Sequence, residues 1–173
     1  MSGCSYPNID MWLWSIWVKT PKLNNSDILI ASACLPHVNK ELFDKIASGK
    51  QVLFACPERE SSAYYGKIAS IIRSSKPKSI TIVTIDGSPH CFQLHAAANE
   101  ATYIVGKEVV KKHYVVVDGK NLTEISPNSI RIARYLHIVE KLINMNPEIL
   151  NELKKHSLEY INELKYKDGS NDT

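Results

Sequence analysis

Three of the four cysteines in this 173-residue sequence follow apolar runs that are typical of buried strands. Cys34 follows one run directly, Cys56 follows a second, and Cys91 follows a third after a short loop. In a parallel sheet the carboxyl ends of the strands lie along one edge, where α/β proteins bind their ligands. Neighbouring strands are about 4.8 Å apart, so thiols at adjacent strand ends can share one pocket. We expect these three cysteines to meet at that edge.

Thiolates and imidazoles in one pocket are ligands for zinc and for iron–sulfur clusters. His90 and His95 lie in the segment after the third strand, and the four-residue spacing of Cys91 and His95 places both on one face of a helix. The start of that helix also favours a thiolate, because its backbone N–H groups carry partial positive charge. The sequence predicts a metal site of Cys34, Cys56 and Cys91, with His90 or His95 as the fourth ligand.

Other groups near this edge are secondary candidates. Asp86 and Glu58 could hydrogen-bond to the ligands of a metal. Whether Cys4 or His37 joins the site stays open. The simpler interpretation is that the cysteines are small hydrophobic side chains that fill space at the strand ends.

Four apolar runs are the predicted strands that position these residues. They cover residues 28–33, 51–55, 79–86 and 113–117. The first three lack polar alternation, which is typical of strands covered on both faces of a parallel sheet. Helical periodicity over residues 39–48, 61–74 and 92–105 predicts the connecting helices. The pattern predicts a three-layer Rossmann-like α/β domain with a mainly parallel four-stranded sheet.

The rest of the sequence completes one predicted domain over residues 1–166. Asp118-Gly119 marks a tight turn, after which residues 121–125 are a candidate hairpin strand. Two C-terminal helices are predicted, one from Pro127 and one from Pro147, each with an apolar stripe. The polar residues 167–173 are predicted to be a disordered tail.

The N-terminal segment 1–20 is rich in tryptophan. Trp12, Trp14 and Trp17 fall in a short apolar stretch that suits either an edge strand or a short helix. These side chains either pack on the core or form an exposed aromatic anchor for a partner.

Composition excludes several classes of protein. The net charge of +3 is small and the charges are interleaved, so no nucleic-acid partner is expected. No apolar run reaches the roughly 18 residues of a membrane span, and the secretory-signal pattern is absent, so we expect a cytoplasmic protein that does not enter the membrane. Four cysteines are too few for a disulfide scaffold, and clustered thiols in a reducing compartment favour metal or redox chemistry. The glycine motifs of dinucleotide and P-loop sites are missing.

Four segments carry a resemblance to a known family. Their sequences, in order, are ACLP (33–36), VLFACP (52–57), KSITIV (78–83) and PHC (89–91). In this order they resemble the C-terminal, cysteine-containing α/β region of ferredoxin-like four-iron iron–sulfur proteins of anaerobes. The resemblance covers about residues 28–95.

The resemblance implies cluster ligands and redox chemistry. Cys34, Cys56 and Cys91 match cysteines of the family pattern. His90 stands where the family has the first cysteine of a Cys-Cys pair, and histidine can replace cysteine as a ligand of iron or zinc. The short-spaced cysteine runs of the ferredoxin-like part are absent from this chain.

Three functional hypotheses follow. The leading one is a metal- or iron–sulfur-binding accessory protein for electron transfer, with an iron–sulfur cluster or zinc as cofactor and a redox partner protein. The second is a zinc- or thiol-dependent enzyme for hydration or hydrolysis that uses the same pocket. The third is a non-catalytic module, in which the cysteines are structural and the C-terminal helices pair in a homodimer.

Overall fold

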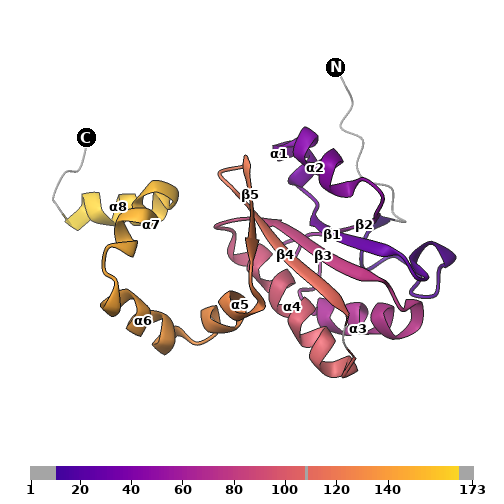
Figure 1. Ribbon diagram of the computed structural model, residues 1–173. Helices are drawn as coiled ribbons and strands as arrows, with labels where there is room; N and C mark the ends of the chain where they lie inside the picture. The colour runs from indigo at the N-terminus through magenta and orange to yellow at the C-terminus, as the bar shows by residue number, and fades with distance from the viewer. Residues whose placement is uncertain (1–10, 108, 168–173) are drawn as a thin grey trace, which may run out of the picture. The chain divides into compact units, whose positions relative to one another are not determined.

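The computed structural model describes residues 11–107 and 109–167 (Figure 1). The chain forms two units, one that ends at Ile130 and one that begins at Arg131, and each is described by itself. The first unit contains Cys34, Cys56 and Cys91, so it holds the predicted site.

The first unit is built on a five-stranded sheet with the strand order β2-β1-β3-β4-β5. Strands β1 to β4 pair in parallel, and β5 returns antiparallel to β4. The strands are β1 (Asp27–Ser32), β2 (Gln51–Ala55), β3 (Ser79–Ile85), β4 (Val110–Val117) and β5 (Asn121–Ile125). The predicted Rossmann-like α/β fold with a mainly parallel sheet is confirmed.

The sheet has five strands rather than four because the hairpin after β4 forms. Asp118 and Gly119 have positive φ angles of 49° and 70°, as a tight hairpin turn requires. The side-chain amide of Asn39 donates to the carbonyl oxygen of Gly119 at 3.1 Å, which ties the turn to the segment before α2. Strand β4 starts at Val110, before the predicted 113, because Lys111 and Lys112 pair with β3 although they interrupt the apolar run.

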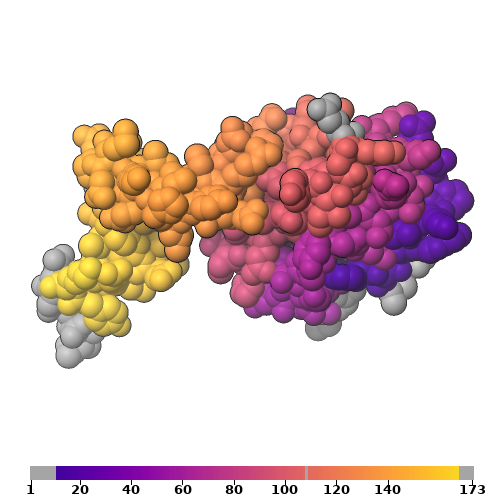
Figure 2. Space-filling model, turned by 90° about the horizontal axis from the view of Figure 1, so that it is seen from below, coloured from indigo at the N-terminus to yellow at the C-terminus, as the bar shows by residue number. Residues whose placement is uncertain are grey.

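Helices cover both faces of the sheet and give the predicted three layers (Figure 1). On one face α3 and α4 form a continuous surface (Figure 2), and on the other lie the shorter α1 and α2. These helices are α1 (Leu35–Val38), α2 (Lys40–Ala47), α3 (Tyr64–Ser75) and α4 (Pro89–Val105). The helix predicted from residue 92 begins at Pro89 because the Ser88 side chain caps it, accepting from the backbone N–H of Cys91.

The core consists of two buried clusters, one on each face of the sheet. Alternate residues of each strand point to opposite faces, so the apolar runs of β1 and β3 supply both clusters. The cluster under α3 and α4 includes Ile28, Ile30, Ile80, Ile82, Ile68 and Leu94. The cluster under α1 and α2 includes Leu29, Ala31, Val83, Leu35 and Phe54. This two-sided burial explains why the strands show no polar alternation.

The tryptophan segment is neither an edge strand nor a regular helix. It makes one isolated bridge, from Trp12 to Phe54 of β2, and Leu13 is buried beside it. Trp12 is half-buried, whereas 66% of Trp17 is exposed, so the three tryptophans do not share one environment. A short 3-10 helix, η2 (Pro21–Leu23), then leads into β1.

The described residues after β5 form four helices where two were predicted. They are α5 (Pro127–Ala133), α6 (Leu136–Met145), α7 (Ile149–His156) and α8 (Leu158–Lys167). Tyr135 and Ser157 leave the helical conformation, and the Ser157 hydroxyl accepts from the backbone N–H of Tyr160, which favours a new helix start there. The apolar stripes continue across both breaks, so periodicity alone could not locate them.

No residue of α6, α7 or α8 is buried among those that the structure describes. Lys167 ends α8, and the rest of the predicted tail lies outside the described residues. Within the described ranges, no helix is both long enough and apolar enough to cross a membrane.

Candidate functional site

The strand order brings the three cysteine-bearing segments side by side. Strand β1 lies between β2 and β3, and the register aligns Ser32 with Ala55 and Ala31 with Val83. Cys34 follows β1, Cys56 directly follows β2, and Cys91 lies in the first turn of α4 after β3. All three thiols are therefore at the carboxyl edge of three adjacent parallel strands.

The three thiols differ in exposure. Cys34 is exposed, Cys56 is half-buried and Cys91 is buried, and none of them forms a disulfide. The pKa of the Cys34 thiol is raised above its ordinary value, first by partial desolvation of its sulfur and then by the negative charge of a Cys91 thiolate. Cys56 and Glu58 raise the same pKa further. Cys34 thus responds electrostatically to both other cysteines, and it is mainly a neutral thiol near pH 7.

Cys91 is held by two serines. Its sulfur lies 3.4 Å from the Ser32 hydroxyl, and its backbone N–H donates to the Ser88 hydroxyl at 3.4 Å. Ser32 was missed by the sequence analysis. The available signal was its position, because Ser32 is a polar residue at the end of an otherwise apolar strand. There its hydroxyl contacts a neighbouring segment at the edge of the sheet.

Glu60 is also part of the edge, although the sequence analysis does not single it out. Its carboxylate accepts from the backbone N–H of Cys56 at 3.3 Å and from the Tyr64 hydroxyl at 2.9 Å. Burial of the Tyr64 ring and its bond to Glu60 both raise the pKa of that phenol. Glu60 therefore anchors the segment after β2, whereas Glu58 and Arg59 are exposed.

The candidate histidines of the site lie in two different places. His37 and His90 are exposed on the first turns of α1 and α4, and His90 adjoins Cys91. His95 is buried and uses both ring nitrogens: Nε2 lies 2.8 Å from the Thr84 hydroxyl, and Nδ1 lies 3.0 Å from Nδ1 of His113. Burial lowers the pKa of His95 to about 4. In this arrangement His95 belongs to a buried polar pair between α4 and β4.

The residues of the predicted metal site are not already arranged as a ligand group. Across residues 11–107 and 109–167, no set of three or more histidine, cysteine, aspartate or glutamate side chains is placed to hold a metal ion. Cys4 lies outside these ranges. Chemically the edge offers soft sulfur donors, which suit zinc and iron–sulfur clusters.

The structure is an α/β domain in which three cysteines lie at the carboxyl edge of the sheet, and the sequence has no glycine-rich phosphate-binding motif. The family model of a Rossmann-like domain matches residues 20–170, so the chain belongs to this family. No curated protein and no solved structure matches the sequence.

Proposed function

We propose that the three-cysteine edge binds a soft metal ion or an iron–sulfur cluster, and that the protein is an accessory protein for electron transfer. One observation supports this most strongly: Cys34, Cys56 and Cys91 come from three adjacent strands, and the pKa of Cys34 responds to both other cysteines. Cysteines that were dispersed in the core and served only for packing would not together raise the pKa of one exposed thiol.

The raised pKa of Cys34 favours a metal ligand over a free nucleophile. A thiol nucleophile needs a lowered pKa, because only the thiolate attacks. At this edge the negative charges of Cys91 and Cys56 oppose the ionisation of Cys34, and a cation removes that repulsion while the bound thiols release their protons. Because the described side chains do not already form a ligand group, the ligands would assemble as the metal binds.

His90 is the favoured fourth ligand. It is exposed, it directly precedes Cys91, and in the resemblance to iron–sulfur proteins it occupies a cysteine position. His95 is less suited, because both of its ring nitrogens already face hydrogen-bond partners. A bound cluster would accept and donate an electron, so the proposal also includes a redox partner protein.

Metal analysis of anaerobically purified protein tests this proposal. We expect iron with a broad visible absorption band, or zinc, at about one site per chain. The triple variant Cys34→Ser, Cys56→Ser, Cys91→Ser should lose both metal and absorption, whereas His95→Gln should retain them. Wild-type protein that contains neither metal in stoichiometric amount after anaerobic handling would contradict the proposal.

A further inference from the structure

A cavity lies away from the cysteine edge, on the face of the sheet that α1 and α2 leave partly open. Its volume is about 690 Å³, within the range of about 300–1,000 Å³ of small-molecule sites. It includes the first residues of β1, β3 and β4, so it lies toward the amino ends of strands whose carboxyl ends bear the cysteines. We call it the lysine groove. Its lining residues are Asp27, Leu42, Lys45, Ile46, Lys50, Lys78, Ser79, Thr81, Val110, Lys112, Tyr114 and Leu122.

The lysine groove has an excess of positive charge. Four of its lining residues are lysines and one, Asp27, is acidic, which leaves three positive charges (4 − 1 = 3). The Asp27 carboxylate accepts from the Ser79 hydroxyl at 2.5 Å, so part of its hydrogen-bonding capacity is already used. Lys50 donates to the carbonyl oxygen of Ile46 at the end of α2. An anion in the groove would relieve the mutual repulsion of the ammonium groups.

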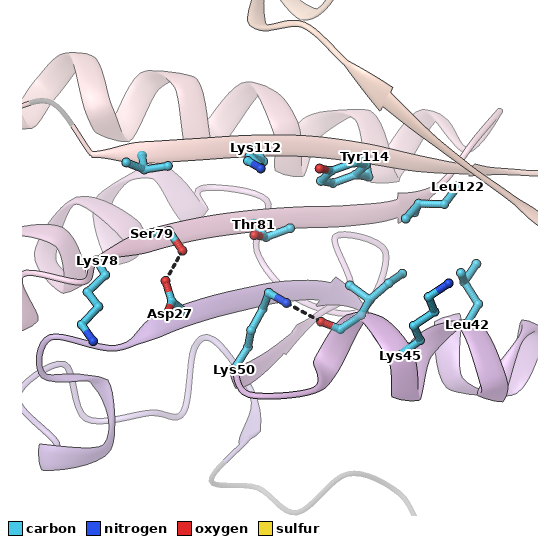
Figure 3. Close-up of a pocket in the computed structure, with 12 residues that line it drawn as sticks. Asp27, Leu42, Lys45, Lys50, Lys78, Ser79, Thr81, Lys112, Tyr114 and Leu122 are labelled. Atoms are coloured by element: carbon cyan, nitrogen blue, oxygen red, sulfur yellow. Dashed lines mark hydrogen bonds between the residues drawn. The ribbon is translucent and has the colours of Figure 1, made fainter.

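None of these four lysines has an anionic partner among the described residues. The ion pairs found there involve Lys40, Lys155, His156 and Lys167, which are all outside the groove. Lys45 extends from α2, Lys112 extends from β4, and the faces of β1 and β3 lie between them (Figure 3). Lys78 marks the end of the groove before β3 (Figure 3). The lysines therefore come from several elements along the groove rather than from one exposed helix face.

The floor and one wall of the groove suit an apolar body. Leu42 of α2 faces Tyr114 of β4 and Leu122 of β5 across the groove (Figure 3), and Ile46 of α2 also lines it. Thr81 is buried in the floor and, with Ser79, adds hydroxyl groups. A few placed polar groups within an otherwise apolar lining are typical of sites for small organic ligands.

We propose that the lysine groove binds a small organic anion, with a carboxylate, sulfonate or phosphate group beside Lys45 or Lys112 and an apolar or aromatic body against Leu42 and Leu122. A nucleic acid does not suit the groove, because the net charge of the chain is only +3 and the cations enclose a short cavity. This inference is independent of the cysteine site, because none of the described cysteines, Cys34, Cys56 and Cys91, lines the groove.

Fluorescence titration of the full chain with anilinonaphthalene sulfonate, an aromatic anion, tests the proposal. We expect saturable binding that weakens with salt and is displaced by an aromatic carboxylate such as salicylate. The double variant Lys45→Gln, Lys112→Gln should bind about tenfold more weakly, since each lost charge contact contributes up to about 1 kcal/mol. Lys40→Gln is the matched control, because Lys40 is on the same helix but pairs with Asp44 outside the groove; it should leave binding unchanged.

A second variant removes any ambiguity from misfolding. Leu42→Glu places a carboxylate in the groove and should abolish binding, while circular dichroism and the melting temperature report whether the chain is folded. Equal binding of the dye by wild type and both groove variants would overturn the proposal. So would the absence of saturable binding by the wild-type chain.

Discussion

Acidification from pH 6.5 to pH 4 is expected to lower the free energy of unfolding by about 3 kcal/mol through one buried histidine, His95. Burial holds the pKa of His95 at about 4 in the folded chain, below its ordinary value of 6.5. As the pH falls through 6.5 the unfolded chain binds a proton that the folded chain does not bind. Stability is therefore lost between these two values and changes no further from this cause below pH 4.

Urea unfolding of wild type and His95→Gln at several pH values measures this effect. The variant should be less stable than wild type at pH 7.5, because it breaks the contacts to Thr84 and His113. Its stability should then fall much less between pH 6.5 and pH 4. His90→Gln is the control, since His90 is exposed on the same helix and should leave the wild-type curve unchanged. Parallel curves for wild type and His95→Gln would show that His95 is not the cause.

Removal of any one of the three edge cysteines is expected to weaken cadmium binding by more than about 100-fold. Loss of a residue that only hydrogen-bonds to a metal ligand already lowers metal affinity by about 10- to 100-fold, and loss of the ligand itself should cost more. Cadmium is a soft probe of thiolate sites, and wild-type affinity should rise with pH because the pKa of Cys34 is raised and its proton must leave. Calorimetric titration of Cys34→Ser, Cys56→Ser and Cys91→Ser gives the three affinities.

Two histidine variants complete that series. His90→Gln should lose affinity if it supplies the fourth ligand, by less than a cysteine variant because the three sulfur donors remain. His95→Gln should bind cadmium as wild type does, since His95 faces Thr84 and His113. A cysteine variant with wild-type affinity would remove that residue from the proposed site.

The sequence predicts the sheet well because the apolar runs of β1, β2 and β3 end at polar or proline-containing segments. The bounds of β2 are those predicted, and β1 and β3 differ from prediction by about one residue. The placement of Cys34, Cys56 and Cys91 follows from those strand ends. The C-terminal helices were harder to predict, because α6, α7 and α8 bury no described residue and their breaks leave the apolar period intact.

Contacts between distant elements could not be predicted from local patterns. His95 and His113 are 18 residues apart and meet only because α4 packs on β4. The four-residue spacing alone places His95 beside Cys91 on a helix. That spacing gives no information about His113, which His95 contacts in the structure. The lysine groove is a stronger example, since its lining residues run from Asp27 to Leu122 and their charges are interleaved with acids along the sequence.

Mass spectrometry of alkylated cysteines, with and without one equivalent of cadmium, tests the central proposal most directly. If Cys34, Cys56 and Cys91 form one metal site, iodoacetamide should label them in the metal-free protein, with buried Cys91 slowest, and cadmium should protect all three together. Labelling at Cys4 in the same spectra reports whether that residue joins them. Protection of a single cysteine, or of none, would contradict a shared site and leave three separate thiols at the edge of the sheet.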